Sequence, residues 1–168
     1  MTAADLTDIE APEARLAALG LTLPAAPGAV ANYVPWAVID NVVMTSGQLP
    51  WIDGDLKYKG RIGAALSGEE GYQACRLSAL NAIAQLRAAA GSLDRIRRVF
   101  RLEGTLNVAE DYRDHPQALN GASDLVNQVF GARGPHLDDL HQPGDAAGLR
   151  RAGGAVRPAR PAEDAGRR

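Results

Sequence analysis

The segment from Ser67 to Gly91 constrains the fold more than any other part of the chain. Ser67 and Glu70 have the spacing of a capping box, in which two side chains satisfy backbone N–H groups at a helix start. Gly91 suits the left-handed conformation that ends many helices. One face of the intervening segment is formed by Tyr72, Cys75, Ala79, Ile83 and Leu86. We therefore expect a long helix that packs by this face.

The residues after this helix change to a period of two. In the stretch RIRRVFRLEGTLNVA, one side is formed by Phe100, Leu102, Gly104, Leu106 and Val108, and the other side is polar. This alternation predicts a half-buried strand. A second helix is predicted to begin at Pro116 and to end before Gly131. Its inward positions are Leu119, Ala122, either Leu125 or Val126, and Val129.

The first 60 residues predict a short helix and several strands. A helix near 11–19 is expected from the Thr7 and Glu10 spacing and from Pro12. Strands follow near 34–39 and 42–46, and LKYKG forms a short edge strand. The order α-β-β-(β)-α-β-α predicts an α+β fold with helices on one face of a mixed sheet.

The last part of the sequence differs from the rest in composition. All eight aromatic residues precede position 131, and residues 134–168 are rich in Gly, Pro, Ala, Arg and Asp without periodicity. Such a segment cannot bury enough apolar surface to offset its ordering entropy. We therefore expect one domain over residues 1–133, followed by a tail over 134–168 that is disordered.

Composition also excludes several classes of protein. The net charge of −2 gives no reason to expect nucleic acid or an anionic membrane as a partner. A single cysteine allows no internal disulfide and no cysteine-based zinc site. No apolar run is long enough to span a bilayer, and the N-terminus lacks the pattern of a secretion signal. A cytoplasmic protein is the resulting expectation.

Few side chains suggest chemistry by their pattern alone. Cys75 lies on the apolar face of the long helix, which favours a buried structural thiol over a nucleophile. His115 precedes Pro116 and is interpreted as a helix-cap or surface residue. His136 and His141 fall in the predicted tail and are expected to be solvated.

The charged pairs of the sequence have two interpretations each. Asp138 and Asp139 could form an acid pair, but a tail favours plain surface charge. Arg97, Arg98 and Arg101 could bind an anion, although a solvated strand face is the simpler interpretation. Residue patterns alone therefore indicate an α+β domain and no particular activity.

A family resemblance adds to this interpretation. The stretch NYVPWAVIDNVVMTSGQLP resembles the signature of the RidA/YjgF family, also described as endoribonuclease L-PSP. The later stretches RIRRVFRLEGTLNVAEDYRDHPQ and ALNGASDLVNQVFG continue the match in the same order, in the form of a longer bacterial branch with an extra N-terminal helix. The similarity covers roughly residues 10–133.

The resemblance implies a chorismate-mutase-like α+β subunit that forms a homotrimer with ligand clefts between subunits. It implies hydrolysis of 2-imino or enamine acids to 2-keto acids and ammonia by a cofactor-independent deaminase, a hydrolase without a metal. Tyr33 would line the pocket, Ser46 and Gly47 would form its floor, and Asn120 its polar wall. Alternatively, Ser46 and Gly47 only end a strand, with the glycine relieving close packing.

The C-terminal part departs from the family pattern. The arginine that grips a substrate carboxylate in the family would fall near Asp138, and the closing strand with its glutamate is replaced by RAGGAVRPARPAEDAGRR. We interpret the tail as disordered or as read in a shifted frame near codon 134. The expected result is weak or no deaminase activity. The alternatives are a non-catalytic trimer that binds a small carboxylated metabolite, or an endoribonuclease or translation inhibitor, against which the net acidity argues.

Overall fold

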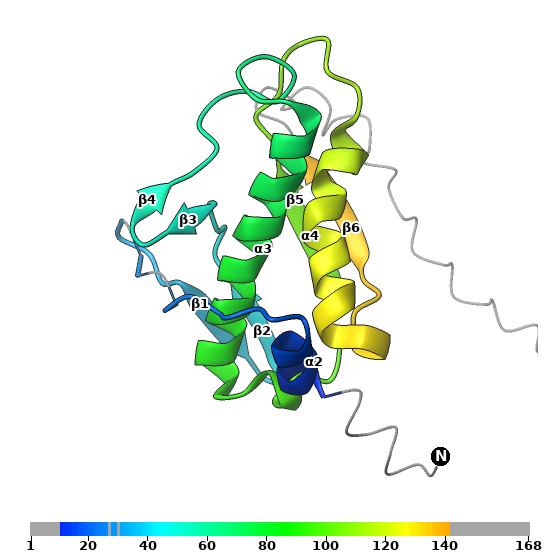
Figure 1. Cartoon of the computed structure of the whole chain (residues 1–168). Coiled ribbons are helices and arrows are strands. Elements are labelled where there is room, and N and C mark those ends of the chain that lie inside the picture. The colour runs from blue at the N-terminus through cyan, green and yellow to red at the C-terminus, as the bar shows by residue number, and fades with distance from the viewer. Residues whose placement is uncertain (1–10, 27, 30, 142–168) are drawn as a thin grey trace, which may run out of the picture.

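A computed structural model describes residues 11–141 of the chain, except 27 and 30. Two long helices, α3 (Gly68–Ala90) and α4 (His115–Phe130), lie side by side in front of strands β5 and β6 (Figure 1). The β1–β2 hairpin lies behind the lower end of α3, on the same side of the helix as β5, and the β3–β4 hairpin lies beside α3 at its left (Figure 1). The predicted α+β architecture, with helices covering strands, is confirmed.

Helix α3 forms as its sequence predicts. The Ser67 hydroxyl accepts a hydrogen bond from the Glu70 N–H at 3.2 Å, and the Glu70 carboxylate accepts one from the Ser67 N–H at 2.8 Å. Gly91 ends the helix with a φ of 80°, in the left-handed region. Cys75, Ala79 and Ile83 are buried along one face, as expected.

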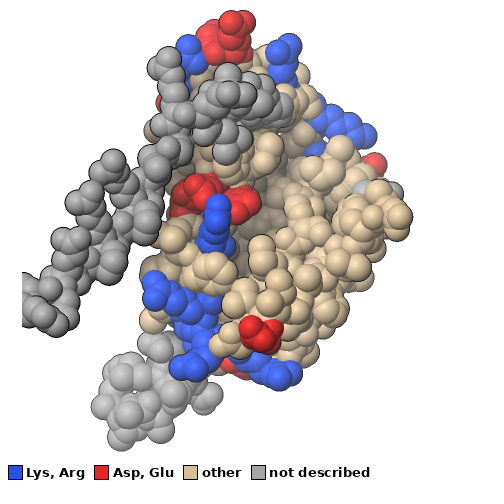
Figure 2. Space-filling view, turned by 180° about the vertical axis from the view of Figure 1, so that it is seen from behind, with Lys and Arg blue, Asp and Glu red and all other residues tan. Residues whose placement is uncertain are grey.

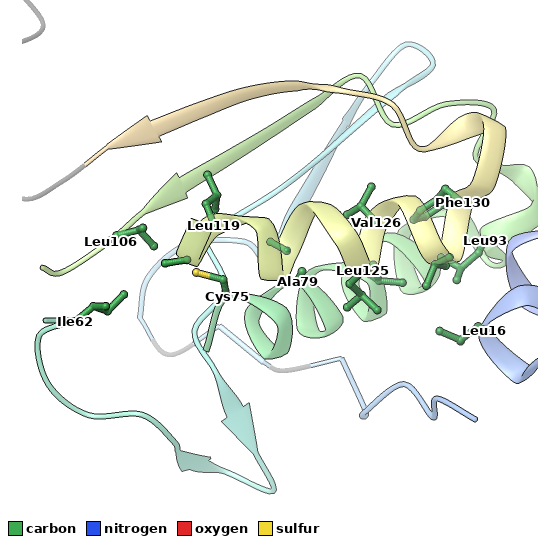
Figure 3. Close-up of a cluster of buried hydrophobic side chains, with 14 residues drawn as sticks. Leu16, Ile62, Cys75, Ala79, Leu93, Leu106, Leu119, Leu125, Val126 and Phe130 are labelled. Carbon is green, nitrogen blue, oxygen red and sulfur yellow. The ribbon is translucent and has the colours of Figure 1, made fainter. Parts of the chain in front are cut away.

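The core lies where α3, α4 and β5 meet. Figure 3 shows Leu125 of α4 pointing toward α3, and Leu119 and Val126 pointing toward the strands. The inward positions predicted for α4 are all buried, including both Leu125 and Val126. Because α4 is apolar along one stripe and polar along the other, burying this stripe stabilises the whole domain.

The strands pair within the described residues as three two-stranded sheets. β1 (Trp36–Ile39) and β2 (Val42–Thr45) form an antiparallel hairpin around Asp40 and Asn41. β3 (Trp51–Ile52) and β4 (Asp55–Leu56) form a second hairpin. Its two loop residues, Asp53 and Gly54, both have positive φ, as the type I′ turn requires. Of the predicted strand LKYKG, only Leu56 is in a strand.

Strand β5 (Arg101–Thr105) is shorter at its start than the alternation predicted. Leu102, Gly104 and Leu106 turn inward, but Phe100 is 52% exposed. The preceding residue, Val99, contacts the core instead. The change of phase before residue 101 explains why the first predicted inward position is wrong.

The prediction that the ordered domain ends at residue 133 is corrected by strand β6 (Leu137–His141). This strand pairs in parallel with β5, so that Arg101 is opposite Leu137 and Thr105 is opposite His141. A helix between two parallel strands is the usual βαβ connection, and here α4 supplies it. The backbone bonds of this ladder order residues whose side chains show no apolar periodicity. Residues 142–168 lie outside the described residues.

The short N-terminal helix α2 (Pro12–Ala18) is tied to the turn that follows α3. The Glu13 N–H donates to Asp94 Oδ1, and Glu13 Oε1 accepts from the Leu93 N–H, both at 3.0 Å. Glu13 also pairs with Arg87 at 3.2 Å. The N-cap is Ala11, without a side-chain cap, and the predicted capping pair Thr7 and Glu10 lies outside the described residues. No helix among the described residues is long and apolar enough to cross a membrane.

Candidate functional site

A small pocket lies where the connector before β1 meets the loop after β2. It is lined by Gly28, Ala29, Tyr33, Pro35, Gly47, Gln48, Leu49 and Trp51, and its volume is about 30 Å³. Tyr33 is 44% exposed at this surface. Because one wall comes from the connector and the other from the β2–β3 loop, the pocket depends on how these two segments are joined.

Ser46 makes that junction. Its hydroxyl donates to the Val34 carbonyl at 2.6 Å, and its N–H donates to the Pro35 carbonyl at 2.9 Å. Its own carbonyl accepts from Gln48 Nε2 at 2.9 Å. Ser46 therefore holds the two walls together, and its hydroxyl proton is already used within the chain.

Gly47 is not a close-packing glycine. A Cβ atom built at this position would meet no atom within 4 Å, and the backbone φ lies outside the left-handed region. Within one chain, Gly47 therefore relieves no close packing. An absent side chain here instead leaves the backbone of the pocket accessible.

Three backbone N–H groups of the β2–β3 loop have no backbone partner among the described residues. Within the described part of the chain, those of Gly47, Gln48 and Leu49 donate to no backbone carbonyl. All three residues line the pocket. Successive free N–H groups form a site that suits an anionic oxygen.

Asn120 does not belong to this pocket in one chain. Its side chain is exposed on the second turn of α4. The first turns of α4 and the connector before β1 lie far apart in Figure 1. The structure thus brings Tyr33, Ser46 and Gly47 together and leaves Asn120 on a separate surface; the ligand-binding role of all four stays a prediction.

Sequence reasoning missed several residues of this site. Gln48, Leu49 and Trp51 follow Ser46 and Gly47 directly, so the SGQLPW stretch contained a signal that the pocket continues along the loop. Asn81 of α3 was also missed. Its amide donates to the carbonyls of Leu49 and Trp51, although the side chain is fully buried. A polar residue between the inward positions Ala79 and Ile83 could have indicated such a partner.

A group of opposite charges lies on the β5–β6 pair. Arg101 bonds to the Asp139 carboxylate and to Glu103 at 2.8 Å. Figure 2 shows acidic side chains gathered beside basic ones on the face turned away in Figure 1. Asp138, where the family pattern would place an arginine, is exposed and opposite Leu102. Arg101 therefore already has two carboxylate partners, and β6 supplies no cation in its place. Arg97 and Arg98 are exposed, as predicted for a solvated face.

The remaining candidate side chains have structural surroundings. Cys75 is buried, as predicted, and burial raises the pKa of its thiol to about 11. His115 begins α4, and its ring lies edge-on to Tyr112 at 5.4 Å. Among residues 11–141 described by the structure, no three His, Cys, Asp or Glu side chains are grouped to hold a metal ion.

The prediction that His136 and His141 are solvated tail residues is wrong. The His136 ring is half-buried, with Nδ1 2.6 Å from the Gly134 carbonyl oxygen and Nε2 3.2 Å from Ser123 Oγ. His141 is half-buried at the end of β6, and its carbonyl accepts from the Leu106 N–H. Formation of β6 brings both residues against the domain.

Residues 13–142 match the family model described as "YjgF/chorismate mutase-like, putative endoribonuclease". The chain belongs to the YjgF/chorismate-mutase-like family. The match to this family extends through β6, so the chain departs from the YjgF pattern later than residue 133.

Individual relatives of this YjgF-family chain span much of its length. Protein TCP17 of Trypanosoma cruzi is 40% identical over 118 residues, which are 70% of this chain and 74% of that protein. A crystal structure from Shewanella oneidensis MR-1, described as a "putative endoribonuclease", has a TM-score of 0.77 and 48% identity, and the match covers 79% of this chain and 87% of that one. Atu1372 of Agrobacterium tumefaciens has a TM-score of 0.73 and 35% identity, with 83% and 85% covered.

Proposed function

We propose that this chain binds a small carboxylated metabolite, of the 2-keto or 2-imino acid class, in clefts between the subunits of a homotrimer. The ligand lies beside Tyr33, Ser46 and Gly47, and Asn120 of the partner subunit provides a polar wall. The observation that carries this proposal is that Gly47, Gln48 and Leu49 line the pocket and that, within the described residues, their N–H groups donate to no backbone carbonyl. They offer a carboxylate the donors that the family arginine would otherwise provide.

The size of the pocket supports a site completed by a second subunit. A volume of about 30 Å³ holds little more than water, whereas ligand pockets measure roughly 300–1,000 Å³. A surface this shallow becomes a cleft when another subunit closes its open side. This also accounts for the separate position of Asn120.

The outer face of the β1–β2 hairpin supports association of subunits. Residues opposite each other in the register share a face, so that Ala37, Ile39, Val42 and Met44 form one side of the hairpin. Ile39 is 62% and Met44 is 57% exposed, while α3 contacts the hairpin. A strand pair that is apolar on both faces is typical of a sheet covered on both sides. A second copy of the chain is the partner proposed for this outer face.

Imine hydrolysis by this chain is expected to be weak or absent. Hydrolysis of a 2-imino acid requires the carboxylate to be held while water adds to the C=N carbon and ammonia leaves. A bidentate guanidinium is well suited to that task. In this structure Arg101 is bonded to Glu103 and Asp139, and Asp138 would repel a carboxylate. Binding is therefore proposed as the main function.

The test is a titration of the ¹⁵N-labelled protein with pyruvate, followed by NMR. We expect the N–H signals of Gly47, Gln48 and Leu49 to shift in a saturable way. Pyruvamide, which has the same shape without the charge, should shift them much less. If pyruvate and 2-ketobutyrate both leave these signals unchanged, the proposal is wrong.

A second assay measures turnover. A 2-imino acid is produced in situ from an amino acid by an amino acid oxidase, and release of the 2-keto acid is followed with and without this protein. The expected result is little acceleration over spontaneous hydrolysis. Robust acceleration would overturn the assignment of weak activity. Because the family description names an endoribonuclease, the same preparation is incubated with RNA; the net charge of −2 argues against cleavage.

A further inference from the structure

The β2–β3 loop, residues 46–50, has no strand ladder to hold it, yet it provides much of the pocket. Within the loop, Gln48 Nε2 donates to the Ser46 carbonyl, and the Trp51 N–H donates to the Leu49 carbonyl at 2.8 Å. The second bond closes a three-residue turn centred on Pro50, whose fixed φ suits it. These local bonds, like those from Ser46 to Val34 and Pro35, do not attach the loop to a helix.

Asn81 makes that attachment from α3. Its Nδ2 donates to the Leu49 carbonyl at 2.9 Å and to the Trp51 carbonyl at 3.1 Å. The two carbonyls flank Pro50, so a single amide group holds both ends of the turn. Figure 1 shows β3, which begins at Trp51, beside the middle of α3.

Asn81 lowers the stability of the fold at its position. It is fully buried in a helix whose neighbouring buried positions include Ile83 and Ala84. Its Oδ1 atom has no hydrogen-bond partner among the described residues. An apolar side chain would avoid this unsatisfied acceptor, so helix stability alone does not explain the asparagine. Its two donors do, because both are directed to the pocket loop.

We propose that Asn81 is a positioning residue for the ligand site. It fixes the Leu49–Trp51 turn and thereby orients the free N–H groups of Gly47, Gln48 and Leu49 toward one anionic group. This inference rests on the proposed function, since it assigns those N–H groups to a carboxylate. Asn81 touches the loop and not the ligand.

The experiment compares Asn81→Leu with Cys75→Ala. Both variants alter a buried side chain of α3, but Cys75 lies in the core among Ile62, Leu106 and Leu119 and not at the pocket (Figure 3). In Asn81→Leu, pyruvate affinity measured from the Gly47 signal should fall about tenfold, the change equivalent to about 1.4 kcal/mol. Cys75→Ala should keep the affinity even though it is destabilised. Equal affinities in the two variants would overturn the proposal.

Hydrogen exchange separates this inference from the proposed function. The Trp51 and Lys57 N–H groups donate to Leu49 and Pro50, and they report on the loop without any ligand. Asn81→Leu should speed their exchange about tenfold relative to Cys75→Ala. If the unaltered protein binds no pyruvate but this exchange difference is found, the proposed function fails and the loop attachment stands. Equal exchange in the two variants refutes the attachment.

A measurement on the unaltered protein covers the case in which Asn81→Leu does not fold. The side-chain NH₂ signals of Asn81 are followed during the pyruvate titration. Binding at the loop should shift them and slow their exchange, because the two bonds to Leu49 and Trp51 become more rigid. Unchanged Asn81 signals at saturation of the Gly47 shift would refute the coupling.

Discussion

Gly47 and Gly121 are required for opposite reasons. A Cβ atom on Gly121 would lie 2.0 Å from the Tyr72 carbonyl oxygen, where α4 crosses α3, whereas one on Gly47 would meet nothing. We expect Gly121→Ala to lower the free energy of unfolding by about 1–3 kcal/mol through overpacking. Gly47→Ala should change it by less than about 0.5 kcal/mol but weaken pyruvate binding.

Urea denaturation of both variants tests this contrast between the glycines. The Gly121→Ala midpoint should fall well below that of the unaltered protein, and the Gly47→Ala midpoint should coincide with it. A neutral Gly121→Ala would mean that the two helices can separate without cost. A strongly destabilised Gly47→Ala would mean that the loop has no room for a methyl group.

Cys75 should be unreactive in the folded protein. Its pKa of about 11, raised by burial, leaves very little thiolate at pH 7. The raised pKa also favours folding only while the thiol is neutral. That advantage is complete below the ordinary thiol pKa and is lost as the pH rises toward 11. Labelling with a maleimide should therefore be slow in native buffer and fast in urea. Rapid native labelling would contradict the buried position.

Only some residues of the candidate site could be predicted from the sequence. Ser46 and Gly47 are predictable because they are neighbours in a recognisable stretch. Both follow the same hairpin, so they must lie close together. Asn81 could not be assigned, because its partners are 30 and 32 residues away in the sequence. Asn120 could not be placed, because its distance from Tyr33 depends on the packing of two separate elements.

The capping box of α3 makes the stability of the fold depend on pH. Hydrogen bonds from Ser67, first from its N–H and then from its hydroxyl, lower the pKa of Glu70 below its ordinary value of 4.5. A lowered pKa means that Glu70 stabilises the fold above pH 4.5, and that this contribution is lost as the pH falls through the folded pKa. Glu70→Gln should therefore be less stable than the unaltered protein at pH 7, with the difference disappearing in acid.

Thermal unfolding between pH 3 and 7 measures this effect. Glu69→Gln is the matched control. Glu69 is in the same turn, but it bonds to Gln73 and takes no part in the capping box. Ser67→Ala should cost about 1 kcal/mol. A difference between Glu70→Gln and the unaltered protein that persists unchanged at pH 3 would show that the charge is irrelevant.

The two long helices were predictable and β6 was not, for a physical reason. Helices α3 and α4 bury regular apolar stripes, and such stripes are visible in the sequence. In β6, Leu137 is 74% exposed and Leu140 is 36% exposed, while Asp139 and His141 are half-buried. Its order comes from pairing with β5 and not from an apolar face. Composition alone therefore placed the end of the domain too early.

For the whole molecule, the homotrimer proposed to form through the outer face of the β1–β2 hairpin can be tested by its mass. Light scattering of the unaltered protein after size exclusion should give the mass of a trimer. Met44→Lys should give a monomer, because a charge in the centre of an apolar contact is costly to bury. Ala17→Lys, on the exposed side of α2, is the control and should remain a trimer. A monomeric unaltered protein would refute the proposed assembly.

The parallel pairing of β5 and β6 also affects which substitutions the fold tolerates. β6 is held by main-chain groups, which every residue except proline provides, so most substitutions along it should cost the fold little. On α4, by contrast, the inward side chains are buried, so a change in their volume should destabilise the core. Substitutions along β6 should therefore alter the surface chemistry of the domain more than its stability, and those along α4 the reverse.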